Sequence, residues 1–553
     1  MTNISGKHAL LKMLQKEGVN YMFGNPGTSE APMMAIMNEY PSIEYVLVLQ
    51  EGVAVGLAEG YARASKKIPF VSLHIDNGMA NGLSLMIDQL YSGTPMVMTA
   101  GNKDIRKMAA GRSDLADMAR PFAKWSTEIT HAEQVPSVIR RAFQEAKTPP
   151  TGPTFISMSQ NAFDDVADVN LIPSSDVHIS TNIDDKTSEE ICDIIMPSKK
   201  PILIVGDRIS QTNAVDEAIK LAEIAGMRVY GHNSSEVNFP ANHPLWQGNL
   251  NMRTIEAVTA VKNADVILAV GCPVFEDFFF QKGEFVSSNT KLIHIDINNN
   301  EIGKSEPTDI GIIASPKNAM KKLFENLESL MTGPYREASS FRTIEAKYES
   351  DIRKENHKNL INQKMKNGHA MSPAKMLDEL AKALPEQSSV FNDGVSSSQL
   401  LFESMLPSKK GSYYGCRGQA IGWGIGATMG MKLGDPSKAA VGVIGDGSAI
   451  MTIQGLWTAA NSKIPSIFVI CNNSSYRVLK INMNHYHRLN NFDPPKSYFA
   501  MDFHHEINFA EQAKAYGING IRIENPADIN STLNKAIDSG EPTVIDMIID
   551  GSI

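Results

Sequence analysis

The chain contains few cysteines, and they lack the close spacing of a metal-binding cluster. Its four cysteines, Cys192, Cys272, Cys416 and Cys471, are scattered over 553 residues. Three of them fall in or beside apolar segments, which is typical of reduced, buried thiols in a cytoplasmic protein. The pattern excludes a small secreted domain that depends on disulfides.

An excess of basic residues and a long apolar run are also missing. Lys and Arg together number 52 against 61 Asp and Glu, for a formal net charge of −9, so we expect no nucleic acid partner. No stretch approaches the roughly 18 apolar residues that a membrane-spanning helix needs, and the N-terminus lacks a basic-then-apolar export signal. We therefore expect a cytoplasmic protein without membrane contact, in which an anionic ligand must be neutralised locally, for example by a metal ion.

The order of apolar runs indicates the fold class. In the first 165 residues, short runs such as residues 45–49 and 70–73 alternate with helical patterns such as residues 53–65, which predicts a parallel sheet covered by helices. The pattern recurs twice, and the first and third regions are candidates for a shared topology. We expect an α/β protein of three domains, each a doubly wound, mainly parallel sheet flanked by helices: residues 1–175, 186–335 and 369–553, with a charged linker at residues 336–368.

Two polar motifs end neighbouring apolar runs in the third region. Gly-Asp-Gly at residues 445–447 ends one run, and Asn-Asn at residues 472–473 ends the next. Carboxyl ends of parallel strands meet at one edge of a sheet, so the side chains of Asp446 and Asn473 should lie together. Carboxylate and amide oxygens suit Mg²⁺, which keeps its other positions for phosphate oxygens and water. The motifs predict a magnesium site that holds a diphosphate.

The residues around Asp446 fit an anion site as well as a plain turn. Gly-Asp-Gly alone is common in turns between a strand and a helix, and the spaced Asn-Asn is the feature that favours the metal site. Gly445 and Gly447 allow the backbone to approach an anion closely, and Ser448 can donate a hydrogen bond. A helix expected over residues 450–462 begins nearby with the positive end of its dipole.

These motifs, with others along nearly the whole chain, resemble those of the thiamine-diphosphate-dependent 2-oxo-acid decarboxylase and acetohydroxyacid synthase superfamily. The segments most similar to the benzoylformate decarboxylase branch are residues 23–30, 49–51, 72–74, 411–414 and 421–424. The resemblance implies a pyrimidine-binding domain, a middle domain and a diphosphate-binding domain, with thiamine diphosphate and Mg²⁺ as cofactors. It also implies a small-molecule 2-oxo acid as substrate, and a homodimer or dimer of dimers with active sites at the subunit interface.

The resemblance assigns three catalytic positions. Glu51 matches the glutamate that hydrogen-bonds the aminopyrimidine ring and shifts its tautomer; without the resemblance, the same carboxylate would be expected simply to stabilise a helix N-terminus. His74 matches an active-site histidine that transfers protons, although a lone histidine is more often structural. Thr28 matches a serine that contacts the substrate carboxylate.

The resemblance also implies a set of cofactor contacts. Ile421 matches the bulky residue that bends the cofactor, and an isoleucine there would equally suit a plain core position. The main-chain oxygen of Ser475 matches a third protein ligand of the metal, beside Asp446 and Asn473. The other implied cofactor-binding positions are Val395, Ser396, Gly445, Gly447, Ser448 and Tyr476.

The chain departs from its relatives where the substrate would bind. Phe278 replaces a second catalytic histidine, so one proton-transfer group is missing. Gly415 and Asn482 stand where the benzoylformate decarboxylase branch has phenylalanines, and Val478 replaces a small residue, so we expect a small aliphatic 2-oxo acid rather than an aryl one. Arg477 suits the carboxylate of a second 2-oxo acid, as carboligation requires, and equally a solvated helix face.

Residues 245–251 lack a glycine expected near a flavin, so we expect no FAD. The polar residues 484–507, which include four histidines, predict a lid or surface loop, and one of these histidines is a candidate replacement for the missing one.

The leading hypothesis is a thiamine-diphosphate- and Mg²⁺-dependent decarboxylase or carboligase that acts on a 2-oxo acid. One alternative is an acetolactate synthase-type transferase that joins two 2-oxo acids. The other is a non-catalytic protein that only binds the cofactor, which the presence of both Glu51 and the metal ligands disfavours.

Overall fold

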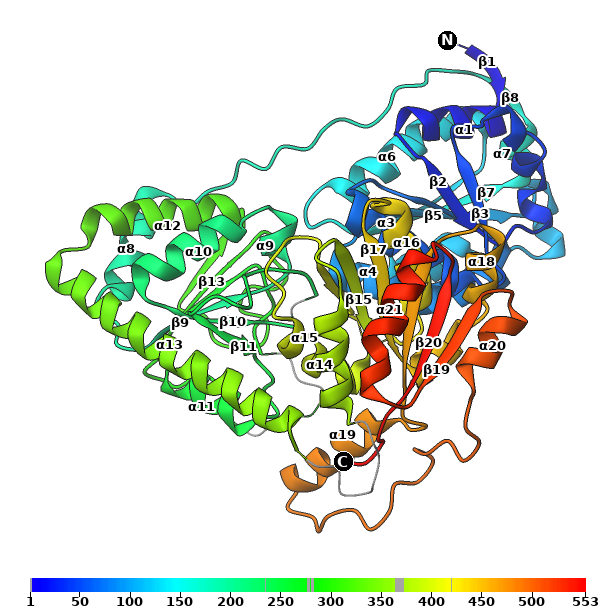
Figure 1. Ribbon diagram of the computed structural model, residues 1–553. Coiled ribbons are helices and arrows are strands. Elements are labelled where there is room, and N and C mark those ends of the chain that lie inside the picture. Colours follow the sequence, from blue (N-terminus) through cyan, green and yellow to red (C-terminus); the bar gives the residue numbers. More distant parts are fainter. Residues whose placement is uncertain (1, 234, 276–278, 280–282, 364–371, 419) are drawn as a thin grey trace.

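The computed structural model describes residues 2–233, 235–275, 279, 283–363, 372–418 and 420–553 (Figure 1). Three six-stranded sheets, in which every strand pairing is parallel, carry helices around them. This architecture confirms the fold class expected from the alternating apolar runs. A separate two-stranded antiparallel sheet joins β1 (Thr2–Ser5) to β8 (Val166–Val169). No helix in the described part of the chain is long and apolar enough to cross a membrane.

The N-terminal sheet has the strand order β3-β2-β4-β5-β7-β6. Its strands are short and rich in buried apolar residues, as expected of a parallel sheet with helices on both faces. They are β2 (Tyr21–Gly24), β3 (Glu44–Leu47), β4 (Phe70–Leu73), β5 (Met96–Asn102), β6 (Trp125–Ile129) and β7 (Pro153–Ser159). The helices of this domain are α1 (Gly6–Lys16), α2 (Ala31–Met34), α3 (Glu51–Ser65), α4 (Ile75–Ser92), α5 (Leu115–Ala119), α6 (Val135–Lys147) and α7 (Gln160–Asp164).

The C-terminal sheet has the order β16-β15-β17-β18-β20-β19. When the strands are numbered within their own six-stranded sheet, each of these two sheets has the order 2-1-3-4-6-5, so the first and third domains share a sheet topology. The strands are β15 (Ser388–Asp393), β16 (Tyr413–Gly415), β17 (Ala439–Gly445), β18 (Ser466–Asn472), β19 (Asn519–Ile523) and β20 (Thr543–Ile548). The helices are α14 (Pro373–Ala383), α15 (Ser398–Met405), α16 (Gly424–Gly434), α17 (Asp446–Met451), α18 (Gly455–Asn461), α19 (Arg477–Leu489), α20 (Phe509–Ala515) and α21 (Ile529–Asp538).

The middle sheet has a different order, β11-β10-β9-β12-β13-β14. Its strands are β9 (Pro201–Val205), β10 (Arg228–Gly231), β11 (Trp246–Asn249), β12 (Val266–Val270), β13 (Lys291–Asp296) and β14 (Ile310–Ile313). Around it lie α8 (Asp185–Ile195), α9 (Arg208–Gln211), α10 (Val215–Ala225), α11 (Ile255–Asn263) and α12 (Pro316–Leu330). The long helix α13 (Gly333–Ile361) covers most of the expected linker, and its buried Ser339 and Arg342 bond to main-chain oxygens of the middle domain.

The single helix expected over residues 450–462 is instead two short helices, α17 and α18. Thr452 ends α17 because its backbone leaves the helical region, with φ −134° and ψ 28°. Its hydroxyl donates to the main-chain oxygen of Gly422, which ties this corner to the segment that precedes α16. The break places the start of α17 at Asp446.

Helices α3 and α16 join the N-terminal and C-terminal domains through glycines (Figure 1). A Cβ atom added at Gly60 would come within 2.0 Å of the main-chain oxygen of Ala427, and one added at Gly430 within 2.1 Å of that of Leu57. The two helices therefore touch backbone to backbone, which only glycine allows at these positions.

We expect Gly60→Ala to destabilise the folded chain by about 2 kcal/mol or more, because the added methyl group has only backbone atoms to displace. The midpoint of denaturant unfolding, followed by circular dichroism, measures the effect. Gly333→Ala, on the exposed start of α13 with no atom within 4 Å of the added Cβ, is the matched control. Equal midpoints for the two variants would contradict the tight contact.

Candidate functional site

The N-terminal candidate residues gather at the carboxyl edge of their sheet. Thr28 lies in the short helix η1 (Thr28–Glu30) after β2, Glu51 is the first residue of α3 after β3, and His74 precedes α4 at the end of β4. The strand order reverses between β2 and β4, and a crevice at such a reversal is where α/β sheets bind ligands.

The carboxylate of Glu51 is held by two asparagines. Its Oε1 accepts from Asn25 Nδ2 at 3.0 Å and its Oε2 accepts from Asn81 Nδ2 at 2.9 Å. The side chain is buried, and the preceding Gln50 accepts from the N–H of Val53 at 3.1 Å to cap the helix. A Cβ added at Gly78 would lie 3.1 Å from Glu51 Oε1, so glycine makes room for the carboxylate. The result is a fixed acid at a helix N-terminus, where negative charge is favoured.

His74 forms a cluster with the residues that follow β2. Its Nδ1 lies 2.8 Å from the hydroxyl oxygen of Ser29 and 3.2 Å from Glu30 Oε2. Glu30 is buried and accepts from the main-chain N–H of Gly27 and of Gly101, at 3.0 and 2.8 Å. The His74 side chain keeps 35% of its surface exposed, so the ring is anchored on one side and accessible on the other.

Ser29, rather than Thr28, supplies the hydroxyl beside the histidine. Thr28 is exposed and forms no side-chain hydrogen bond within the described ranges. Sequence reasoning missed Ser29 and Glu30 as functional candidates, although both lie in the segment 23–30 that carried the resemblance. Gly27 shows why that segment is glycine-rich, since a Cβ there would lie 2.3 Å from Cγ of the His74 ring.

The expected metal ligands meet in the C-terminal domain. Asp446 is buried at the start of α17, where its Oδ1 accepts from the N–H of Gly447 at 2.7 Å and its Oδ2 from the N–H of Asn473 at 3.0 Å. Burial raises the pKa of Asp446 to about 6, against a smaller lowering by these main-chain donors. Oδ1 of Asn473 accepts from the N–H of Ser475 at 3.0 Å. Asp446 at the start of α17 and residues 473–475 after β18 thus lie together, and we call this group the metal loop.

The donor set of this loop fits a magnesium ion. It offers one carboxylate, one amide oxygen and one main-chain oxygen, and all three are hard oxygen ligands. Among the residues the structure describes, no three His, Cys, Asp or Glu side chains cluster as a metal site. Asp446 is the single acidic member of the expected ligand set, which suits a divalent ion that shares its remaining positions with phosphate oxygens.

Other expected cofactor-binding residues lie around Asp446. The Tyr476 ring lies over Gly447, where an added Cβ would come within 2.5 Å of Cε1. Ser448 accepts from the N–H of Gly422 at 2.8 Å and donates to Asp393, a buried carboxyl whose pKa burial raises to about 7. Val395 has a left-handed backbone with φ +46° and an exposed side chain, and its neighbour Ser396 and the more distant Ile421 are partly buried. Asp393 is a further residue that the sequence did not single out.

The two halves of the expected site do not contact each other within one chain. Glu51 bonds to Asn25 and Asn81 of its own domain, whereas Asp446 bonds to main-chain donors of the C-terminal domain. Within the described ranges, no hydrogen bond or ion pair links the Glu51 group to the metal loop.

The substrate-pocket candidates lie on α19 or outside the described residues. Nε of Arg477 donates to the main-chain oxygen of Ser552 at 2.8 Å, and burial lowers the pKa of this guanidinium. Val478 is partly buried in the same helical turn. Phe278 lies outside the described residues. The adjacent Phe279 has its ring 5.7 Å from that of His485, which is buried, so α19 packs against the middle domain.

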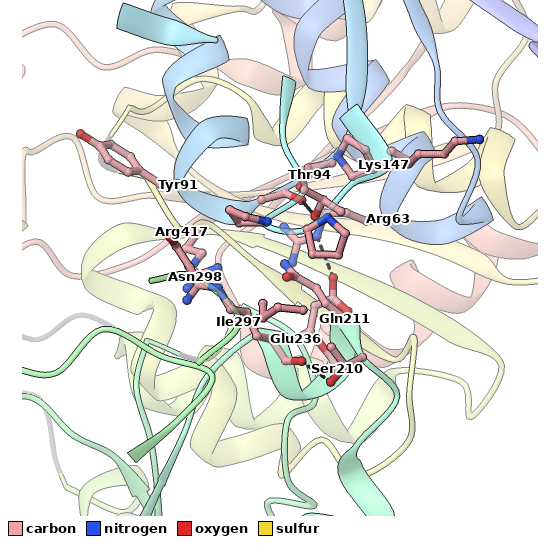
Figure 2. Close-up of a pocket in the computed structure, with 18 of the residues that line it drawn as sticks. Arg63, Tyr91, Thr94, Lys147, Ser210, Gln211, Glu236, Ile297, Asn298 and Arg417 are labelled. Carbon is pink, nitrogen blue, oxygen red and sulfur yellow. Dashed lines mark hydrogen bonds and ion pairs between the residues drawn. The ribbon is translucent and has the colours of Figure 1, made fainter. Parts of the chain in front are cut away.

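A cavity of about 710 Å³ lies where the three domains meet (Figure 2). Arg63 lines it and forms ion pairs with Glu59 and Glu236, both at 3.2 Å, and Arg417 lines it and pairs with Asp207 at 3.3 Å. None of the candidate site residues that the structure describes lines this cavity. Its buried ion pairs connect residues of all three domains.

A buried glutamate at the edge of one sheet and the paired Asp446 and Asn473 at the edge of a sheet of the same topology are expected of one class: enzymes that hold a diphosphate cofactor between two related α/β domains. Comparison with protein families agrees. Three models of thiamine pyrophosphate enzymes match the chain, the N-terminal TPP binding domain at residues 4–122, the central domain at 188–323 and the C-terminal TPP binding domain at 394–547. The chain belongs to the thiamine pyrophosphate enzymes, as its motifs predicted.

Individual relatives place the chain within the family. It is 25% identical to a benzoylformate decarboxylase of Pseudomonas aeruginosa over 98% of both chains. It is 26% identical to the acetolactate synthase large subunit of Haemophilus influenzae, over 100% of this chain and 96% of that one. A solved 4-hydroxybenzoylformate decarboxylase of Rhodococcus jostii has the same fold, with a TM-score of 0.84 at 24% identity over 99% and 100% of the two chains. The protein is a thiamine-diphosphate-dependent carbon–carbon lyase or carboligase.

Proposed function

We propose that the protein is a thiamine-diphosphate- and Mg²⁺-dependent decarboxylase or carboligase of a small aliphatic 2-oxo acid. The observation that carries this proposal is the pair of half-sites at matching edges of two sheets: Glu51 clamped by Asn25 and Asn81, and Asp446 joined to Asn473. When bound, thiamine diphosphate supplies the electron sink that allows a 2-oxo acid to lose carbon dioxide.

The side chains of this protein would position the cofactor, exchange a proton with its ring and hold the metal that neutralises its diphosphate. Glu51 offers a fixed carboxylate to a ring nitrogen, and its two asparagines prevent it from rotating away. Asp446, Asn473 and the Ser475 carbonyl would hold the metal that neutralises the diphosphate. Gly445 and Gly447 would allow the backbone to approach the diphosphate closely, and Ser448 would place a polar side chain beside it.

His74 is the proposed proton carrier for the reacting carbon. Its Nδ1 is engaged by Ser29 and Glu30, which fixes the ring plane and leaves the remaining nitrogen for substrate. Thr28 lies next to this cluster and is exposed, so its hydroxyl is available to a substrate carboxylate.

The proposal of an aliphatic substrate rests on crowding beside α19. The ring of Phe279 lies 5.7 Å from the ring of His485 and 6.0 Å from that of Tyr486. Arg253, also of the middle domain, donates to Asn482 of α19 at 2.8 Å. Val478 adds a branched side chain on this helix, and a small acyl group suits such a space better than an aryl group does.

A substrate panel tests the function. Holoenzyme is incubated with pyruvate, 2-oxobutyrate and benzoylformate, carbon dioxide is measured and products are identified by NMR. We expect carbon dioxide and an aldehyde or acyloin from the aliphatic acids. Preference for benzoylformate would overturn the aliphatic assignment, and cofactor binding without any turnover would favour a purely binding role.

The second candidate is an acetolactate synthase-type transferase, and Arg477 is the observation that favours it. Its guanidinium lies at the start of α19, close to the metal loop in sequence, and it donates a hydrogen bond to the main-chain oxygen of Ser552 near the chain end. Release of the chain end from Arg477 would make a carboxylate site available. A 2-hydroxy-3-oxo acid product from pyruvate in the same NMR experiment would identify this reaction, and aldehyde alone would exclude it.

We also propose that active sites form between subunits, in a homodimer or dimer of dimers, because each chain leaves its two half-sites apart. A 1:1 mixture of Glu51→Gln and Asp446→Asn chains, unfolded and refolded together, should regain about a quarter of the wild-type rate, since half of random dimers are mixed and each then has one intact site. Turnover assays of the mixture against each variant alone measure this. Co-purification of chains that carry two different affinity tags shows that mixed dimers have formed, and no recovery of turnover in such a mixture would contradict intersubunit sites.

The remaining expectations stay predictions. These are a cytoplasmic location, the identity of the metal as Mg²⁺, and the absence of FAD. An absorbance band at about 450 nm in the purified protein would indicate a flavin and contradict the last of them.

A further inference from the structure

The segment of residues 501–503 is paired with the metal-binding loop. Ser475 and Asp502 form an antiparallel bridge, in which the N–H of Tyr476 donates to the oxygen of Met501 and the N–H of Phe503 donates to the oxygen of Ser474, both at 2.8 Å. The hydroxyl of Ser475 also donates to the oxygen of Met501, at 3.0 Å. The chain therefore returns 26 residues later to hold the metal loop.

The bridge determines where the Ser475 carbonyl points. Its two hydrogen bonds use the main-chain groups of the residues on either side of Ser475, so the N–H and C=O of Ser475 itself face away from the 501–503 segment. The N–H on that far side donates to Oδ1 of Asn473, one of the expected metal ligands. The Ser475 carbonyl is thus turned toward the metal side of the loop.

One ion pair holds the paired segment to α19. Nζ of Lys480, in the first turn of α19, contacts Oδ1 of Asp502, and Lys480 is buried although it is a lysine. The same Nζ lies 5.9 Å from the ring centre of Tyr498, whose hydroxyl donates to Asn484 of α19 at 2.9 Å. Lys480 accordingly contacts the returning segment at two points.

Residues 490–500, which precede the 501–503 segment, make few buried apolar contacts. Phe492 and Phe499 are 55% and 90% exposed, and Asn491 and Ala500 have left-handed backbones. Little apolar packing therefore opposes their separation from the body, which makes the polar contacts at residues 498 and 501–503 decisive.

We infer that Lys480 and Asp502 are positioning residues for the metal site: their ion pair keeps the 501–503 segment bridged to Ser475 and so presets the Ser475 carbonyl for the metal. This inference rests on the proposed metal and cofactor site. In the structure, the charge of Lys480 binds another part of the chain rather than a ligand.

The test measures metal requirement rather than turnover. Calorimetric titration of the apo-protein with thiamine diphosphate at a series of MgCl₂ concentrations gives the half-saturating Mg²⁺ concentration. We expect Lys480→Ala and Asp502→Ala each to raise the half-saturating Mg²⁺ concentration about fivefold. The effect is modest because Asp502 is half-exposed and solvent screens its ion pair. Lys480→Arg and the exchanged pair Lys480→Asp with Asp502→Lys should restore most of the wild-type value.

Two controls separate this role from general damage. Lys514→Ala removes an exposed pair with Glu511 on α20 and should leave the Mg²⁺ requirement unchanged. Each variant's unfolding midpoint is compared with that of the wild type, and kcat at saturating Mg²⁺ should stay within about twofold.

The outcomes are distinct. A wild-type Mg²⁺ requirement in folded Lys480→Ala protein overturns the inference, while wild-type protein that needs no metal to bind the cofactor overturns the proposed site. If the alanine variants fail to fold, the comparison is made with Lys480→Gln, which keeps most of the side chain's length and loses its charge. An unchanged Mg²⁺ requirement in that variant also rejects the inference.

Discussion

Asp446→Asn should abolish metal-dependent binding of thiamine diphosphate, lowering the affinity at fixed Mg²⁺ by more than about a hundredfold. Asp446 is the single carboxylate of the expected ligand set, so its loss removes the only negative charge that this set presents to the cation. The substitution keeps the shape of the side chain, and its amide oxygen can accept one of the two bonds that Gly447 and Asn473 donate to separate oxygens of Asp446. The same calorimetric titration of apo-protein measures the change.

The matched control for this prediction is Asp528→Asn, an exposed aspartate of the same domain that precedes α21. It should bind cofactor as the wild type does. Retained metal-dependent binding by Asp446→Asn would mean that the diphosphate is held elsewhere, and the site assignment would be wrong.

Glu51→Gln should bind the cofactor normally and lose about a thousandfold in turnover. An amide has no proton-accepting carboxylate to offer a ring nitrogen, while its size still fills the space between Asn25 and Asn81. Exchange of the acidic thiazolium proton of the bound cofactor into deuterated water, followed by NMR after rapid acid quench, should slow by a similar factor.

Glu39→Gln, which changes an exposed glutamate of the same domain, is the control and should leave both rates unchanged. Wild-type proton exchange in Glu51→Gln would remove Glu51 from the chemistry. It would then be left with the role of a helix-capping charge, the alternative that its sequence position alone suggests.

The sequence was sufficient for the features that depend on local order along the chain. Runs of buried apolar residues predicted the strands that precede Glu51, His74, Asp446 and Asn473, and because the strands are parallel, the residues after them lie at one edge of each sheet. The topology shared by the first and third domains was only a possibility in the sequence, because strand order across a sheet is not encoded in any one segment.

Contacts between distant segments could not be predicted in this way. Asn25 and Asn81 flank Glu51 from 26 and 30 residues away, and Ser29 meets His74 across 45 residues. Each is an ordinary polar residue whose partner is set by how helices dock on the sheet. Arg477 has the same explanation: its charge was visible, while its contact with the chain end depends on the path of the last residues.

The glycine contact between α3 and α16 limits how the molecule can move. With backbone against backbone at Gly60 and Gly430, neither helix can slide past the other without driving main-chain atoms together. Within one chain, the domain that carries Glu51 and the domain that carries Asp446 therefore travel as a single rigid body. We expect any motion that accompanies turnover to involve less tightly packed parts such as residues 490–500, where substitutions can change the turnover rate without moving the two domains relative to each other.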